Sequence, residues 1–303
     1  MIYAIVVTYN GVTWIEKCFN SLLSSNIKLK IIAIDNSSND GTTIIIRQKF
    51  PSIELIELPE NIGFGKANNI GINKAMNDGA DYVFLLNQDA WIESDAVQYL
   101  VDQHRKNPEY GVLSPFQLNG SNTEIEQGFI HYISPIYCKG LISDLYFNKT
   151  IDNIYEVTFV NAASWLISRE CLLKLKGFDP LFFHYGEDNN FVHRLKYAGF
   201  KIGVCPQVRI YHDRIPFREK IFFTKREIVI ERNFKIILTN PNVSNPEKII
   251  KKEIFQRLLY TSFVLNIRQL KDTLSMYFIF QKTKRQIYKN RESRLYYYSF
   301  LIK

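Results

Sequence analysis

Short apolar runs alternate with segments of helical periodicity through the first 106 residues of the chain. The strand-like runs are residues 2–8, 29–34, 53–58 and 82–86. The helix-like segments are residues 14–23, 42–50, 65–77 and 94–106. This alternation is typical of βαβ units, so it predicts a Rossmann-like α/β fold with a mostly parallel sheet. Right-handed crossovers bring the carboxyl ends of the strands to one edge, where open α/β sheets bind ligands.

Polar residues follow three of these strands at the predicted ligand-binding edge. After the first two strands, Thr8 and Asp35 can accept hydrogen bonds from a base N–H or a ribose hydroxyl. After the fourth, Asn87 and Asp89 offer two hard oxygens of the kind that Mg²⁺ or Mn²⁺ accepts beside a phosphate. A polar turn or a helix cap is the alternative interpretation of each segment. The sequence therefore predicts a nucleotide pocket with a divalent ion and leaves the structural alternative open.

The segment from Pro59 to Gly71 contains more glycine and asparagine, which are unfavourable inside a helix, than an ordinary loop and helix start. Two glycines bracket Phe64, and the start of the helix that follows, up to Gly71, carries one cation, Lys66, and the adjacent Asn68 and Asn69. Asparagine is a poor residue inside a helix. The pattern favours a helix terminus that holds a sugar nucleotide, with Lys66 near phosphate, over a glycine loop with asparagine caps.

Two acids, Glu187 and Asp188, stand at the start of a predicted helix, residues 187–198. Acids at a helix N-terminus are electrostatically favoured, which is the structural interpretation. A carboxylate in a cleft can also remove the proton of an acceptor hydroxyl. His212 follows the predicted short strands 202–205 and 208–212 and could share a metal with Asp89. We expect residues 115–152 to form an elaborated loop over the sheet edge, and regular structure to resume at 157–161 and 165–168.

The charge of the chain is unevenly distributed. Residues 214–303 carry 20 Lys and Arg against 7 Asp and Glu, whereas the first 213 residues carry 18 against 23. After Pro216 the pattern is amphipathic and helical, so we expect a catalytic domain at 1–215 and a basic helical extension at 216–303. A basic amphipathic helix is typical of a membrane-surface segment. The alternative is an appendage that packs on the core or on a second subunit of a homo-oligomer.

The remaining features indicate in which cellular compartment the protein acts and which classes of function are disfavoured. The four scattered cysteines predict buried thiols in a reducing compartment. Residues 2–8 resemble a first strand rather than a signal peptide, and no run reaches about 18 uncharged apolar residues. We therefore expect a cytoplasmic protein, with the basic tail at the inner face of the membrane. The basic, Tyr-rich tail also suggests a nucleic-acid-binding protein, although the acidic body argues against a nucleic-acid partner. A nucleotidyltransferase is disfavoured because Thr8–Gly11 carries no cation.

These segments, taken in order, resemble the inverting family 2 glycosyltransferases, and within them the rhamnosyltransferase-like branch. The similarity spans residues 2–212, and the ordered set of motifs is far more specific than any one of them. The matching motifs are Ile5–Asn10, Ile34–Gly41, Glu60–Asn69, Leu86–Asp89, Val160–Ile167, Gly186–Asp188, Arg194–Gly199 and His212.

The resemblance implies a GT-A type nucleotide-diphospho-sugar transferase fold and a role for each matching residue. The donor, a UDP- or dTDP-sugar such as dTDP-rhamnose, would be bound by Thr8, Tyr9, Asn10, Asp35, Asn61, Gly63, Lys66, Asn68, Asn87 and Gln88. A glycan acceptor, for which a lipid-linked glycan is one candidate, would be bound by Asn161, Ser164 and Trp165. The metal, Mg²⁺ or Mn²⁺, falls on Asp89 and His212. The base falls on Asp188, with Glu187 beside it, in an enzyme of cell-surface polysaccharide synthesis.

Three positions depart from the family pattern. The first position of the metal motif is Asn87, which predicts an ion that depends on Asp89 and the diphosphate. Asn190 stands where an acid commonly follows the Glu-Asp pair, which leaves open how the helix start is held. The small-residue turn often written Gly-Ala is Ala162-Ala163, which bears on the acceptor subsite.

Overall fold

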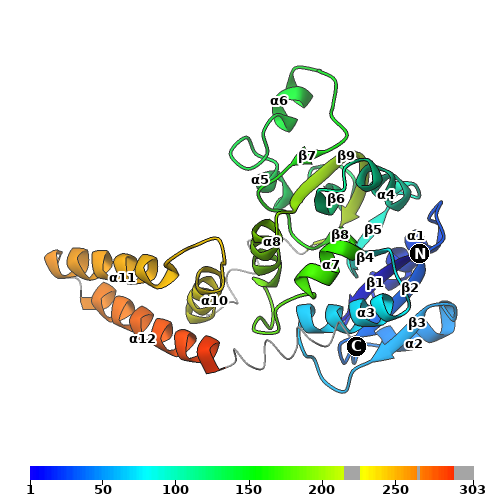
Figure 1. The fold of residues 1–303 in the computed structure, drawn as a ribbon. Coiled ribbons are helices and arrows are strands. Elements are labelled where there is room, and N and C mark those ends of the chain that lie inside the picture. The colour runs from blue at the N-terminus through cyan, green and yellow to red at the C-terminus, as the bar shows by residue number, and fades with distance from the viewer. Residues whose placement is uncertain (215–225, 265–266, 290–303) are drawn as a thin grey trace.

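The computed structural model describes residues 1–214, 226–264 and 267–289. The predicted alternation is confirmed in the first part of the chain, where strands and helices begin and end within two residues of their expected bounds (Figure 1). The strands are β1 (Ile2–Thr8), β2 (Lys30–Asp35), β3 (Glu54–Glu57) and β4 (Tyr82–Asn87). The helices are α1 (Ile15–Leu23), α2 (Thr42–Lys49), α3 (Phe64–Asn77) and α4 (Ala96–Lys106).

All described strands join one sheet, in the order β3-β2-β1-β4-β8-β6-β9-β5, with β7 paired to β9. Strands β1 to β4 are parallel to one another. The strand β8 (Ser164–Ser168) is antiparallel to both β4 and β6 (Tyr110–Asn119), so β4 and β6 run the same way. The sheet is therefore mostly parallel, as predicted, but the reversed β8 begins at the edge where its neighbours end.

The region after residue 110 is more regular than expected. β6 runs on to Asn119, and the short helices α5 (Phe129–Tyr132) and α6 (Leu141–Tyr146) follow it. The two strands expected at 202–205 and 208–212 are one strand, β9 (Lys201–His212). Its partners explain the misjudged break: Cys205 pairs with Pro115 but Arg209 pairs with Phe116, so the residues around Pro206 bulge out of the ladder. The short β5 (Ala90–Ile92) and β7 (Tyr155–Glu156) pair with β9 and were not predicted.

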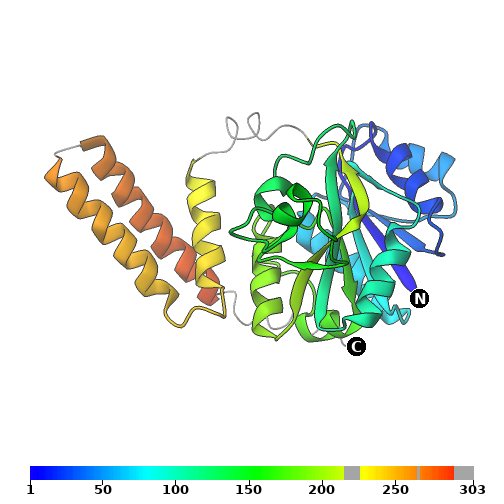
Figure 2. The same ribbon diagram turned by 90° about the horizontal axis from the view of Figure 1, so that it is seen from above.

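Apolar side chains on both faces of the sheet explain the three-layer arrangement (Figure 2). Along β1, Tyr3 and Ile5 enter one core while Ala4 and Val6 enter the other, as strand alternation requires. One core includes residues of α3, α7 (Arg169–Leu175) and α8 (Glu187–Tyr197), and the other includes residues of α1, α2 and α4. Burial on both faces holds the strand ends rigidly, which positions the site.

The C-terminal extension forms helices with a core of their own. The first two helices are separated at two Asn-Pro pairs, because α10 (Arg226–Leu238) ends before Asn240 and α11 (Pro246–Phe263) begins at Pro246. With α12 (Ile267–Lys289), these helices bury a cluster that includes Phe234, Ile250 and Phe280. Helices α11 and α12 extend away from the sheet, and α10 lies beside α8 (Figures 1 and 2).

Among the described residues, two hydrogen bonds join the extension to α8. The Asn190 amide donates to Thr239 Oγ1 (2.9 Å), and the Asn242 amide donates to the carbonyl of His193 (2.8 Å). The expected domain boundary at 215/216 lies outside the described residues, and the division into 1–215 and 216–303 stays a prediction. No helix in the described ranges has the length and apolar character needed to span a bilayer.

Candidate active site

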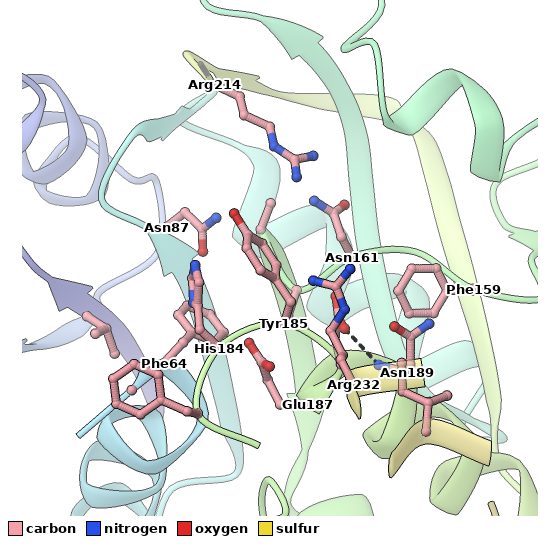
Figure 3. Close-up of a pocket in the computed structure, with 18 of the residues that line it drawn as sticks. Phe64, Asn87, Phe159, Asn161, His184, Tyr185, Glu187, Asn189, Arg214 and Arg232 are labelled. Atoms are coloured by element: carbon pink, nitrogen blue, oxygen red, sulfur yellow. Dashed lines mark hydrogen bonds between the residues drawn. The ribbon is translucent and has the colours of Figure 1, made fainter. Parts of the chain in front are cut away.

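One large cleft opens at the edge where the parallel strands end. Its volume is about 1390 Å³. The ends of β1 and β4, the loops before β8 and α8, and helix α10 all contribute to its walls (Figure 3). The expected residues that line it are Tyr9, Asn61, Gly63, Asn87, Gln88, Asp89, Asn161, Glu187, Asp188 and His212. The structure thus brings together residues that are up to 203 positions apart in the sequence.

The ends of β1 and β4 are fastened together by one side chain. Gln88 Oε1 accepts a hydrogen bond from the Tyr9 amide (2.9 Å), and Gln88 Nε2 donates to the Tyr9 carbonyl (3.0 Å). This pair of bonds continues the ladder for one residue beyond the strands. Gly11 permits it, because a Cβ there would lie 2.1 Å from Gln88 Oε1. Asn10 continues the same turn in a left-handed conformation (φ +49°) and accepts a hydrogen bond from the Asn39 amide.

Asp35 is buried beneath the cleft and fully occupied by neighbouring donors. One carboxylate oxygen accepts hydrogen bonds from the Thr8 hydroxyl (2.8 Å) and the Ser38 hydroxyl (2.5 Å). The other accepts one from the Ser38 amide (2.8 Å). Thr8 and Asp35 are both buried, and neither lines the cleft. In this arrangement their contribution is to hold the turn after β2 in place.

The glycine loop before α3 is held by two asparagines. Asn36 donates to Asn61 Oδ1 (2.9 Å) and accepts from the Ile62 amide (2.8 Å), while Asn61 Oδ1 also accepts from the Gly63 amide (2.9 Å). Gly63 has φ +90° and its Cβ position lies 2.1 Å from the Phe183 carbonyl, so only glycine allows the two loops to touch. Sequence reasoning missed Asn36, whose position after β2 was the available signal.

Two residues of α3 that were expected to bind the sugar donor, Lys66 and Asn68, do not line the cleft. Asn68 is buried and its side-chain amide donates to the Phe64 carbonyl one turn earlier in α3 (3.0 Å). Lys66 is half-buried on α3 and does not line the cleft. The second of the adjacent asparagines, Asn69, exchanges two 2.8 Å hydrogen bonds with the backbone of Phe178. The costly asparagines are therefore explained by helix and loop packing.

Asp89 and His212 meet at the end of β4, as predicted. Asp89 Oδ1 lies 3.3 Å from His212 Nε2, and the histidine is buried. Two ligands at adjacent corners of an octahedral ion would be about 3.0 Å apart, so this spacing fits a shared divalent cation. Asn87 Oδ1 is buried without a hydrogen-bond partner in the described structure. The orphaned oxygen and the close pair together match the donor set expected for a metal beside a diphosphate.

Glu187 and Asp188 enter the cleft from a sharp turn. Tyr185 (φ +65°) and Gly186 (φ +95°) are both left-handed, and they reverse the chain just before α8. Glu187 is buried, and its Oε2 has no hydrogen-bond partner within the described residues. Asp188 is half-buried and accepts a 2.8 Å hydrogen bond from the Asn189 amide. The turn thus places two carboxyl groups side by side with few donors to support their charge.

Burial governs the protonation of this pair. Burial, together with the neighbouring Asp188 charge, raises the pKa of Glu187 to about 8. Burial also raises the pKa of Asp188, against the opposing effects of backbone hydrogen bonds and of Arg214 and Arg232. Two carboxyl groups at one site resist ionising together. Burial and the mutual repulsion of the two charges therefore both favour a protonated carboxyl group in this pair.

Two arginines surround the carboxyl pair, and sequence reasoning missed both. Arg214 follows His212 by two residues, lines the cleft and lies 3.8 Å from the buried Glu126. Arg232 comes from α10 and lies over the Tyr185 ring, 5.5 Å from its centroid (Figure 3). No carboxylate approaches the Arg232 guanidinium within ion-pair distance in the described part of the chain. The arginines make this side of the cleft a setting for anionic groups.

Comparison with known proteins settles the family. The family described as Glycosyl transferase family 2 matches residues 3–173, which is more than half of the chain. The chain belongs to glycosyl transferase family 2. The family match and the relatives below give no support to the alternative of a nucleic-acid-binding protein.

Two of the similar curated proteins are rhamnosyltransferases. This glycosyltransferase is 23% identical over 230 residues to the N-acetylglucosaminyl-diphospho-decaprenol L-rhamnosyltransferase of Mycobacterium tuberculosis, with 69% of this chain and 75% of that protein covered. It is 25% identical over 267 residues to rhamnosyltransferase WbbL of Escherichia coli, with coverage of 77% and 97%. The crystal structure of a TarS fragment from S. aureus superposes with a TM-score of 0.60 at 16% identity, covering 99% of this chain and 88% of that one. The predicted GT-A type fold is confirmed.

Of the three residues expected to bind the acceptor, one lines the cleft and two are buried in the core. Asn161 lines the cleft, and its Oδ1 is buried without a partner among the described residues. Ser164 and Trp165 are buried in β8, and the Trp165 ring stacks on Phe178 inside the core. The preceding Ala162 and Ala163 do line the cleft. The glycosyltransferase therefore presents the loop before β8 to a ligand, while β8 itself supports that loop.

The Asn190 departure has a structural explanation. Its Oδ1 accepts a hydrogen bond from Arg194 (2.8 Å), and its Nδ2 donates to Thr239. A carboxylate at this position could accept from the arginine but could not donate to the threonine. The amide thus joins α8, which begins with the two acids, to the end of α10, which carries Arg232 into the cleft.

Proposed function

We propose that this family 2 glycosyltransferase moves a sugar from a UDP- or dTDP-sugar to a hydroxyl of a lipid-linked glycan and inverts the anomeric carbon. The two relatives named as rhamnosyltransferases make dTDP-rhamnose our first candidate donor. The printed acceptor of the mycobacterial relative, a diphospho-decaprenol glycan, makes a lipid-linked diphosphate our first candidate acceptor.

One observation carries the proposal. The carboxyl pair Glu187 and Asp188 and the pair Asp89 and His212 line the same cleft, although they come from the start of α8 and from the ends of β4 and β9. Inverting transfer needs a base on one side of the reacting carbon and support for a leaving diphosphate on the other. The cleft offers both kinds of group within one volume.

In the proposed reaction Asp188 removes the proton of the acceptor hydroxyl. The acceptor oxygen forms a bond to the anomeric carbon as the bond from that carbon to the donor phosphate breaks. The nucleoside diphosphate leaves with the bonding electron pair, and the proton remains on Asp188. Glu187 orients the base or the acceptor. One displacement needs one base, so no covalent nucleophile is required.

A divalent cation, Mg²⁺ or Mn²⁺, would be held by Asp89 and His212, with Asn87 beside them. When bound, such an ion neutralises charge on the leaving diphosphate. The structural neighbour PcManGT from Pyrobaculum calidifontis, a mannosyltransferase, was solved with GDP-Man and Mn²⁺, and TarS was solved with UDP-GlcNAc. The buried, orphaned Asn87 oxygen supports placing the ion at this end of the cleft.

We further propose that the enzyme acts in the cytoplasm, on the inner side of the membrane. The four cysteines are buried free thiols, which is the state expected in a reducing compartment.

A donor panel tests this function. We expect calorimetry with Mn²⁺ to detect binding of one UDP- or dTDP-sugar, and NMR of the transfer product to show an inverted anomeric centre. Asp89→Asn should weaken donor binding by about tenfold or more in the presence of Mn²⁺, while Asp213→Asn, outside the cleft lining, serves as the matched control. Absence of binding to every sugar nucleotide, or a product that retains its configuration, would overturn the proposal.

A further inference from the structure

The exposed side of α12 carries a stripe of alternating apolar and basic residues. We define the outer stripe of α12 as the exposed residues Ile267, Lys271, Leu274, Phe278 and Arg285. These positions are i, i+4, i+7, i+11 and i+18, which share one face of a helix with 3.6 residues per turn. Ile267 is 71% exposed, Leu274 44% and Phe278 68%.

The opposite side of α12 is the one that packs. Thr273, Met276, Phe280 and Thr283 are buried, and they lie half a turn away from the outer stripe. Met276 and Phe280 join the core formed with α10 and α11. Because that core takes up the inner side of α12, the outer stripe is directed away from the other helices of the extension. In Figures 1 and 2 the hairpin of α11 and α12 itself lies away from the sheet.

The charge of α12 identifies the occupant of this stripe. The helix carries six Lys and Arg against one acid, Asp272, and Arg226 of α10 already pairs with that acid. The outer stripe contains cations and no acid. Lys282 borders the stripe and stays 76% exposed although it lies 3.8 Å from Glu231. Two copies of such a surface would repel each other, whereas an anionic surface would attract it.

We propose that the outer stripe of α12 docks on the surface of an anionic bilayer. In this arrangement Ile267, Leu274 and Phe278 enter the boundary between headgroups and acyl chains, and Lys271 and Arg285 contact lipid phosphates. The helix lies in the plane of the membrane and does not cross it. The inference is independent of the reaction proposed above, because vesicle binding requires no sugar donor.

Vesicle flotation of the full chain tests the docking surface. We expect binding to vesicles of equal parts phosphatidylglycerol and phosphatidylcholine, little binding to phosphatidylcholine alone, and weaker binding in high salt. Lys271→Gln with Arg285→Gln should lower the affinity about 25-fold, since each cation near an anionic leaflet raises it about fivefold. Leu274→Gln with Phe278→Gln should lower it by about tenfold or more. Circular dichroism checks that both variants keep their helices.

Two matched controls give the test its specificity. Lys28→Gln with Lys106→Gln removes the same charge from exposed sites on the catalytic domain. Ile136→Gln with Tyr146→Gln removes apolar side chains that are 82% and 76% exposed near α5 and α6. Both controls should float like the parent chain. The proposal is overturned if the stripe variants float as well as the parent, if a control loses binding to the same degree, or if the parent ignores anionic vesicles. Light scattering could instead show a dimer that the Leu274 and Phe278 substitutions dissociate. If the parent chain also fails to bind vesicles, the stripe would be assigned to contact with a second copy of the chain.

Discussion

Two acidic regions at the same sheet edge differ in how many hydrogen bonds their carboxyl groups accept. Asp35 receives hydrogen bonds from the Thr8 hydroxyl and from both the amide and the hydroxyl of Ser38. Glu187 and Asp188 share one turn, and Glu187 Oε2 receives none from the described residues. Burial raises the pKa of both members of the pair.

The difference separates a scaffold carboxylate from a reactive one. Hydrogen bonds to a buried carboxylate offset the cost of removing its charge from water, so an acid with several donors holds its surroundings in place. An acid without donors stays ready to take a proton, because protonation relieves the cost of its burial. The hydrogen bonds of Asp35 indicate a structural role in the cleft, whereas the poorly supported Glu187–Asp188 pair is consistent with our proposal that this pair takes part in the reaction.

Replacing Asp188 is expected to have the largest effect on transfer activity. Asp188→Asn keeps the size of the side chain but removes the base, so we expect transfer to fall about 100-fold to 10 000-fold. Donor binding measured by calorimetry should stay within a factor of about two, because the base faces the acceptor. Full transfer activity in this variant with donor binding intact would refute the assignment.

Asp35→Ala should mainly affect stability. The change leaves the Thr8 hydroxyl and two Ser38 groups without their acceptor in a buried site, so we expect the free energy of unfolding to fall by about 3 kcal/mol. Urea denaturation measures it, with Asp81→Ala at an exposed position as the control. A variant as stable as the parent but with lost donor affinity would make Asp35 a ligand-binding residue, as the family resemblance implies.

The contrast also shows what the sequence could predict. Alternation of strands and helices located the sheet edge, and with it Asn87, Asp89 and Gln88, because strand ends are set by local patterns. The function of Asn68 and Trp165 could not be predicted, because burial depends on which elements pack above them. Arg232 gave no signal at all. It lines the cleft because α10 packs beside α8, a helix that begins about forty residues before α10 in the chain.

Glu187→Gln should stabilise the protein at neutral and alkaline pH. Burial raises the pKa of Glu187 from 4.5 to about 8, so the folded parent keeps a proton that the unfolded chain releases. Stability of the parent therefore falls as the pH rises from about 4.5 to about 8, and glutamine removes that dependence. We expect the variant to melt about 5 °C higher at pH 9 and at the same temperature at pH 4. Calorimetric Tm measurements across this range check it, with the exposed Glu60→Gln as control; a constant difference at every pH would contradict the charge argument.

The smallest expected effect concerns Arg232 of α10. The charge of this arginine lowers the pKa of Asp188, whereas burial raises it. Removing the cation in Arg232→Gln should raise the pKa of Asp188 further, so the base stays protonated to a higher pH. The acid limb of the kcat profile should then move to higher pH, while the rate on the alkaline side changes little. Arg257→Gln removes the same charge from the exposed side of α11 and should leave the profile unchanged. A shift of equal size in both variants would mean that the whole basic extension acts through its summed charge. A shift confined to Arg232→Gln would mean that the extension completes the active site through one side chain, held there by Asn190 and Thr239.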